Sequence, residues 1–258
     1  MTVDRKKSKI HLPWPGLLLL AVLPLGLIAA CGEQNTTPPK FSGEMVLAVS
    51  WQPGFCETRP RLPECRSQKK SHFDASHFSL HGLWPQPRSE TYCGVSDSEM
   101  RKDTSRQWSR LLGLGLAEDL QRRLLKVMPG ARSFLHRHEW IKHGTCYSDD
   151  PNVYYEDSLL LMEQVNASSL QNLFARSIGK RLTARQIRRA WNAEFGPQAG
   201  ERLRISCKRD GRRTIITELT IGLSGKITQD SKLEELIAAA KPTRPGCPAG
   251  IVDPAGLQ

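Results

Sequence analysis

The stretch Phe134-Leu135-His136-Arg137-His138-Glu139-Trp140-Ile141-Lys142-His143 lies between Pro129-Gly130 and Gly144. A proline–glycine pair interrupts helices and a glycine often follows the last helical residue, so this stretch is predicted to form a short helix. At about 100° per residue, four ionisable side chains fall within about 140° of one another around its axis: His138, Lys142, Glu139 and His143. The sequence therefore predicts four ionisable groups on one helix face.

The pair His138-Glu139 also begins the pattern of a zinc protease helix, in which the second histidine lies four residues after the first. Lys142 occupies that position here, and His143 lies one residue further along. This spacing does not let both histidines chelate from one side, and an ammonium group beside the site would repel a metal ion. We therefore expect no metal.

A second histidine lies in Phe78-Ser79-Leu80-His81-Gly82-Leu83-Trp84-Pro85. Apolar and polar residues alternate along this stretch, which predicts a β-strand with Ser79 and His81 on one face. Two histidines near neutral pKa suit a reaction that needs an acid and a base together. Transfer of an RNA phosphoryl group from a 5′-oxygen to the adjacent 2′-hydroxyl is such a reaction, and Lys142 can neutralise the charge of its transition state.

Strands are predicted on both sides of a helical block. Residues 45–51, 203–208 and 214–222 are rich in β-branched residues or end at turn signals, as strands do. Between them, apolar residues recur with helical spacing over four segments: 116–127, 154–165, 170–178 and 183–195. This order predicts an α+β fold in one domain.

The two histidine-bearing stretches resemble the two active-site signatures of the ribonuclease T2 family. Either signature alone is fairly specific, and both occur here in the family's order. The resemblance covers about residues 45–253. Within the family, the sequence pattern most resembles that of bacterial periplasmic ribonuclease I. The residues that carry it are 78–85, His138-Glu139-Trp140-Ile141-Lys142-His143-Gly144-Thr145-Cys146, Trp51-Gln52-Pro53-Gly54-Phe55-Cys56, Val127-Met128-Pro129-Gly130 and Asp150-Pro151.

The resemblance implies a ribonuclease T2-like α+β fold, with a central antiparallel sheet packed with several helices. It also implies an endoribonuclease that cleaves single-stranded RNA with low base specificity and without a cofactor. By this resemblance His143 takes the 2′-proton as general base, and His81 protonates the departing 5′-oxygen as general acid, which leaves a 2′,3′-cyclic phosphate. His138 is expected to help bind the phosphate, and Glu139 and Lys142 to stabilise the transition state.

Two aromatic residues are predicted to contact bases. Trp84 matches the family position that stacks on a base, and such stacking contributes about 1–3 kcal/mol with little base preference. Packing in the core is the alternative for Trp84, because it follows Leu83 at the end of a strand. Tyr92 is predicted to be a second stacking wall. Gln86 stands where some relatives carry an acidic residue that reads adenine, so no base preference is predicted.

Six of the seven cysteines are expected to form three disulfides: Cys56, Cys65, Cys93, Cys146, Cys207 and Cys247. An even number of cysteines in an exported chain indicates an oxidising compartment, although the residues alone leave the pairing open. The family resemblance implies Cys56–Cys65, Cys93–Cys146 and Cys207–Cys247. The second of these would tie the strand of His81 to the helix of His143.

Residues 1–30 are predicted to be a lipoprotein-type export signal, because four basic residues precede an apolar stretch over 17–28 that is too short to span a membrane. Ile28-Ala29-Ala30-Cys31 resembles a lipobox, whose cysteine is acylated; simple secretion is the alternative. Residues 31–44 are then an anchor and flexible tether, and residues 45–258 the catalytic domain. We expect a periplasmic or cell-envelope protein, lipid-anchored through Cys31 or else secreted.

The chain has a formal net charge of +11, and loss of residues 1–30, with four basic residues and one acidic residue, leaves +8. This charge favours a polyanion such as RNA as partner, although a basic surface also serves solubility or binds acidic lipids. We expect a monomer without an obligate protein partner.

Two other functions compete with an RNA-cleaving enzyme. A non-catalytic RNA- or polyanion-binding lipoprotein of the same fold would use the positive charge and Trp84, but it would not need a complete set of acid, base and lysine. A metal-dependent phosphohydrolase or protease would lose its activity in a chelator.

Overall fold

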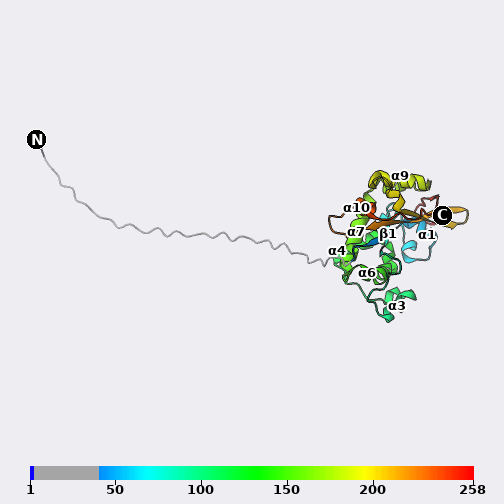
Figure 1. Cartoon of the computed structure of the whole chain (residues 1–258), viewed down its shortest axis with the longest axis horizontal. Helices are drawn as coiled ribbons and strands as arrows, with labels where there is room; N and C mark the ends of the chain where they lie inside the picture. Colours follow the sequence, from blue (N-terminus) through cyan, green and yellow to red (C-terminus); the bar gives the residue numbers. More distant parts are fainter. Residues whose placement is uncertain (3–40) are drawn as a thin grey trace. The chain divides into compact units, whose positions relative to one another are not determined.

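The computed structural model describes residues 1–2 and 41–258. The residues from 41 onward belong to one structural unit (Figure 1). The predicted lipidation site Cys31, and all but the first two residues of the predicted signal, lie outside the described residues. None of the helices in the described part of the chain is long and apolar enough to cross a bilayer.

A single sheet of six strands is found in the described residues. Its strands are β1 (Glu44–Ser50), β2 (Ser79–Pro85), β3 (Arg181–Thr183), β4 (Leu203–Asp210), β5 (Arg213–Ser224) and β6 (Ala249–Ile251). The strand order is β2-β1-β5-β6-β3, and β4 also pairs with β5. Every pairing is antiparallel except the short contact between β5 and β6. The predicted central sheet is confirmed, and it is mixed rather than wholly antiparallel.

The helices that apolar periodicity predicted are all present, as α4 (Glu118–Val127), α7 (Pro151–Ala167), α8 (Ser169–Ala175) and α9 (Ala184–Phe195). Asp150 caps the N-terminus of α7, because its carboxylate accepts a hydrogen bond from the N–H of Asn152 at 2.8 Å. Figure 1 shows α3 and α9 at opposite ends of the folded unit. The remaining α-helices are α1 (Gln52–Glu57), α2 (Pro63–Arg66), α3 (Asp97–Thr104), α5 (Leu135–Glu139), α6 (Thr145–Tyr147) and α10 (Leu233–Ala239).

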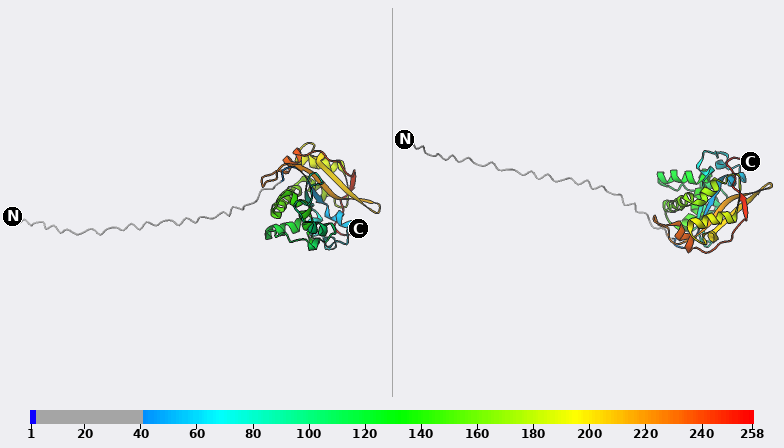
Figure 2. Two further views of the ribbon diagram at one scale, coloured as in Figure 1. Left: turned by 60° about the horizontal axis from the view of Figure 1, so that its bottom comes forward. Right: turned by 90° about the horizontal axis from the view of Figure 1, so that it is seen from above.

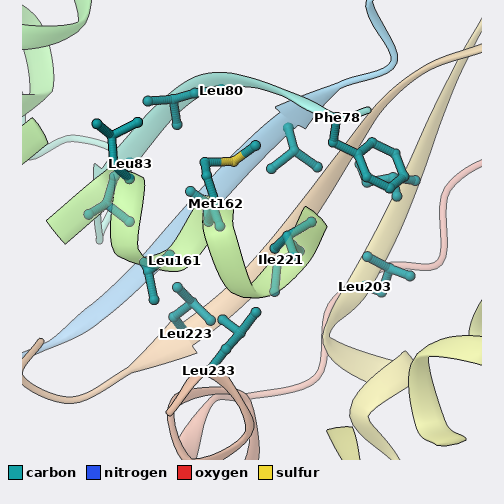
Figure 3. Close-up of a cluster of buried hydrophobic side chains, with 14 of the residues drawn as sticks. Phe78, Leu80, Leu83, Leu161, Met162, Leu203, Ile221, Leu223 and Leu233 are labelled. Atoms are coloured by element: carbon teal, nitrogen blue, oxygen red, sulfur yellow. The ribbon is translucent and has the colours of Figure 1, made fainter. Parts of the chain in front are cut away.

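The core lies between one face of the sheet and α7. Figure 3 shows Leu161 and Met162 of α7 beside Leu83 on β2 and Ile221 and Leu223 on β5. All five side chains are at most 1% exposed. Full burial of each such side chain contributes about 1.5–3 kcal/mol to stability. Because side chains alternate along a strand, this packing leaves the opposite face of β1, β2 and β5 free for polar groups.

Three disulfides join the pairs that the family resemblance implied. The Cα–Cα distances are 5.0 Å for Cys56–Cys65, 4.9 Å for Cys93–Cys146 and 6.0 Å for Cys207–Cys247. The second bond ties the loop after β2 to α6. The third ties β4 to the segment that leads into β6. Each bond is expected to stabilise the fold by about 2–4 kcal/mol.

Candidate active site

A β-bulge sets the direction of His81 on β2. In the pairing of β1 with β2, Ala48 lies opposite Gly82 and Val49 lies opposite Leu80, so His81 is the extra residue between them. A bulge bends its strand and re-aims one side chain, and bulges are common next to functional sites. The imidazole of His81 is 31% exposed and is therefore accessible to a substrate.

The carboxylate of Glu218 on β5 holds this imidazole. Nδ1 of His81 lies 2.6 Å from Oε2 of Glu218. Burial by itself lowers the pKa of His81, but the hydrogen bond to Glu218 and the negative charges of Glu139 and Glu218 outweigh burial, so the pKa is raised. His81 is therefore held in its protonated form and can donate a proton.

Sequence analysis missed Glu218, which is separated from His81 by 137 positions. The one signal in the sequence is a carboxylate in the middle of a strand that is otherwise mostly apolar or uncharged. Glu218 also lies beside a bulge, because Ser206 on β4 is opposite Glu218 whereas Cys207 is opposite Ile216. Such a register shift cannot be read from a single strand.

The second signature forms one continuous helical segment that starts one residue later than predicted. Phe134 has a left-handed backbone with φ of 63°, and α5 begins at Leu135. After α5 the chain makes a π-helical turn over Trp140–Gly144 and continues as α6. Gly144 is therefore not the residue after the helix, as predicted, but lies inside it. A glycine is needed at this position for a steric reason, because a Cβ there would lie 2.4 Å from Cε3 of Trp140.

The π turn also corrects the predicted angles between the ionisable side chains. Thr145 donates its backbone N–H to the carbonyl of Trp140, five residues earlier. A turn closed over five residues rotates less per residue than an α-helix and brings residues five apart toward the same side. His138 and His143 are five apart, and the positive charge of His138 contributes to the lowered pKa of His143.

His143 is held in its neutral form. Burial lowers its pKa, and the charges of Lys142, His138 and His81 lower it further, to about 3. The helix continues past His143 into α6, so His143 does not lie at a helix C-terminus that would favour the protonated imidazole. The centroid of the His143 ring lies 5.6 Å from the centroid of the Trp84 ring. A neutral imidazole can accept a proton.

The Glu139 carboxylate connects the strand signature to the helix signature. It is 1% exposed, and its Oε2 accepts a hydrogen bond from Nε1 of Trp84 at 2.7 Å. Its Oε1 lies 3.6 Å from Nε2 of His81 and 3.9 Å from Nε2 of His138. Gly82 makes this approach possible, because a Cβ there would lie 2.1 Å from Oε2 of Glu139 and 2.5 Å from Nε1 of Trp84.

His138 is fixed by Asp103, a second residue that sequence analysis missed. Nδ1 of His138 lies 2.8 Å and 2.9 Å from the two carboxylate oxygens of Asp103, which is 2% exposed. The His138 ring also stacks on Trp108 with centroids 4.6 Å apart. Tyr92 donates its hydroxyl to Asp103 at 2.8 Å, which connects this predicted stacking residue to the site. Asp103 lies on a short polar helix whose sequence resembles any exposed helix.

Trp84 and Lys142 lie close to both histidines. The centroid of the Trp84 ring is 5.3 Å from that of His81, so the indole contacts both imidazoles. The charge of Lys142 lowers the pKa of both histidines. No hydrogen bond or ion pair of its ammonium group is found within residues 41–258. Lys142 can therefore offer its charge to a bound anion.

The structure thus brings together the residues that the two signatures predicted, with one imidazole protonated and the other neutral. Two titratable groups whose surroundings move their pKa values apart can act as an acid and a base in the same step. Among residues 1–2 and 41–258, no group of three or more His, Cys, Asp or Glu side chains is arranged to hold a metal ion.

A family model described as the ribonuclease T2 family matches residues 42–237. Ribonuclease I of Escherichia coli (strain K12) is 30% identical over 233 residues, which cover 81% of this chain and 86% of that protein. Japanese pear S3-RNase has the same fold, with a TM-score of 0.53 at 17% identity over 81% of this chain and 98% of that one. RNase NT in complex with 5′-AMP has a TM-score of 0.52 at 19% identity, over 84% and 100% of the two chains.

Proposed function

The chain belongs to the ribonuclease T2 family, and we propose that His81 and His143 are the acid and the base with which this endoribonuclease cleaves RNA. This assignment rests on the opposite shifts of their pKa values, because the pKa is raised for His81 and lowered for His143. An acid must hold its proton and a base must lack one at the start of the step. With the pKa of His81 raised and that of His143 lowered, both conditions are met at pH values between the two pKa values.

In the proposed step, the neutral His143 takes the proton of the ribose 2′-hydroxyl, and the 2′-oxygen bonds to phosphorus. The bond from phosphorus to the 5′-oxygen breaks, and His81 gives its proton to that oxygen. The products are a 2′,3′-cyclic phosphate and a free 5′-hydroxyl. Lys142 stabilises the extra negative charge on the phosphoryl oxygens as the step proceeds.

Neighbouring groups are proposed to hold this pair in place. His138, fixed by Asp103, donates from Nε2 to a phosphate oxygen. Glu139 is proposed to orient His81 and His138, and it fixes the indole of Trp84 by accepting a hydrogen bond from the indole N–H. Trp84 and Tyr92 are proposed to contact bases, a role supported by the nucleotide in the RNase NT complex. A non-catalytic binder of the same fold is not favoured, because relatives across the family are ribonucleases.

Cleavage is expected to need the 2′-hydroxyl and no metal. Residues 32–258 should cleave single-stranded RNA in excess EDTA and leave 2′,3′-cyclic phosphate ends, but they should not cleave DNA of the same sequence, which lacks the nucleophile. Mass spectrometry of the products detects the cyclic phosphate ends of the RNA and shows whether the DNA is intact. Cleavage of DNA, or loss of RNA cleavage in EDTA, would contradict the proposed step.

Replacement of Glu218 by glutamine is expected to move the alkaline limit of activity to lower pH. The Glu218 carboxylate raises the pKa of His81, so its neutral substitute lowers that pKa. Because His81 must be protonated, kcat/KM should then begin to fall at a lower pH, while the acid limb set by His143 stays in place. The profile of kcat/KM against pH measures both limbs.

The matched control is Glu44→Gln, which removes the same charge from β1 of the same sheet. The carboxylate of Glu44 pairs with Lys241 at 2.7 Å and with neither histidine. Its pH profile should match that of the unchanged protein. An unshifted alkaline limb in the Glu218 variant would show that Glu218 does not hold His81 in its protonated form.

The protein is further proposed to be exported and held at the cell envelope by a lipid on Cys31. The three disulfides support an oxidising compartment. The intact mass of the native protein should correspond to a chain that begins at an acylated Cys31, and Cys31→Ser should release the activity from the membrane fraction. A native mass without acyl chains would instead indicate simple secretion.

A further inference from the structure

A hollow of about 560 Å³ lies over β4 and β5, next to the pair of Glu218 and His81. Residues 204–208 of β4 line it, together with Thr217 and Glu218 of β5. Among them, Arg204, Ser206 and Lys208 alternate along β4, so their side chains point to one face of the strand. Ser206 is directly opposite Glu218 in the register of the two strands. Glu218 therefore borders both the hollow and the candidate active site.

The two cations of the hollow are free to bind an anion. Arg204 and Lys208 are exposed, and neither forms an ion pair or a side-chain hydrogen bond with any residue that the structure describes. Each lies about 7 Å along β4 from Ser206, on opposite sides of it. The negative charge of Glu218 between them is compensated by the hydrogen bond to His81. Neighbouring Arg213 differs, because Glu57, Asp210 and Asp253 already surround its guanidinium.

Positive charge continues from the hollow along the β4–β5 hairpin. Figure 2 shows this hairpin extending past the rest of the folded unit in both views. Its exposed residues near the tip include Arg209 and Arg212. A chain of phosphates that leaves the hollow along β4 would therefore meet further cations.

The proposed roles of the histidines give this surface a direction. In an in-line displacement, the attacking 2′-oxygen and the leaving 5′-oxygen lie on opposite sides of phosphorus. His143 serves the attacking oxygen and His81 the leaving one, so the leaving nucleotide lies on the side of His81. The carboxylate that holds His81 forms one wall of the hollow.

We propose that this hollow binds the RNA segment on the 3′ side of the scissile phosphate, with Arg204 and Lys208 contacting its phosphates. The inference rests on the proposed acid and base roles of His81 and His143. It adds a binding surface that favours substrates with several nucleotides after the cleavage site. A substrate that ends one nucleotide after the cleavage site gains nothing from it.

Oligonucleotides that contain one ribose among deoxyriboses test the proposal, because cleavage is then confined to one position. Three substrates are needed: a short one, one extended by four deoxynucleotides on the 3′ side, and one extended by four on the 5′ side. The readout is the ratio of kcat/KM for each extended substrate to that for the short one. Because both values come from the same protein, any general effect of a substitution cancels.

For the unchanged protein we expect the 3′ extension to raise kcat/KM by about tenfold at low salt, since each neutralised phosphate strengthens binding electrostatically. In the double variant Arg204→Glu and Lys208→Glu this ratio should fall to about one, and the ratio for the 5′ extension should keep its value. The slope of log kcat/KM against log salt concentration for the 3′-extended substrate should become shallower by about 0.7 for each phosphate that is no longer neutralised.

The control double variant is Lys226→Glu and Lys232→Glu, which makes the same charge change on exposed residues beyond the far end of β5. It should keep the ratio of the unchanged protein. An undiminished 3′ ratio in the β4 variant, or an equal loss in the control, would overturn the proposal. Absence of cleavage of the short substrate by the unchanged protein would instead overturn the proposed function, so the two failures are distinguishable.

Discussion

Replacement of His143 or His81 by alanine is expected to lower kcat for RNA cleavage by at least about 10². Without His143 no neutral imidazole takes the 2′-proton, and without His81 the 5′-oxygen leaves unprotonated. Neither substitution opens a hole in the core that packs around α7, so the fold should persist. Single-turnover cleavage at saturating enzyme measures the chemical step without interference from product release.

The two variants should differ from each other in their dependence on pH. The base limits activity on the acid side, where protonation of His143, with its pKa of about 3, removes it. The acid limits activity on the alkaline side, where His81 loses its proton. The residual activity of His143→Ala should therefore lack the acid limb, and that of His81→Ala the alkaline limb. Turnover close to normal in either variant, with RNA binding retained, would contradict the assignment.

Replacement of Gly82 by alanine is expected to lower kcat by about 10². The added Cβ would lie 2.1 Å from Oε2 of Glu139, so the buried carboxylate must move. Glu139 holds Trp84 by a hydrogen bond and lies between His81 and His138. A displacement of about 1 Å in a catalytic group can cost about 10² in rate.

The matched control is Gly113→Ala, because a Cβ at Gly113 meets no atom within 4 Å and its backbone is not left-handed. This variant should keep normal activity. Circular dichroism and the thermal midpoint establish that both variants are folded. A folded Gly82→Ala protein with normal kcat would show that the close approach of Glu139 to β2 is not needed for catalysis.

The sequence by itself predicted the elements that carry both signatures, but not α3, which carries Asp103. Alternating residues around His81 predicted β2, and apolar periodicity predicted α4, α7, α8 and α9. These patterns are local, because each element must bury one face, and the spacing of its apolar residues along the sequence shows which face that is. The helices α1, α2, α3 and α10 escaped prediction, since none has more than eight residues and so few residues show little helical period.

Local reasoning was wrong at the helix of the second signature. The Gly144 that was expected to follow the helix lies within it, and a π turn that includes His143 replaces regular α-helical rotation. Gly144 is needed there because the ring of Trp140 occupies the space of its Cβ. Gly144 resembles a helix-termination signal, but its packing against Trp140 on the same helix is the reason that a glycine stands there.

The sequence alone determined which groups are available for chemistry: two imidazoles, a lysine and a carboxylate in two short signatures. Only the tertiary structure decided their protonation states and partners. Glu218 reaches His81 across 137 positions through a sheet register, and Asp103 reaches His138 from another helix. The physical reason is that a pKa depends on burial and on nearby charges, and both are set by segments that meet only when the chain folds.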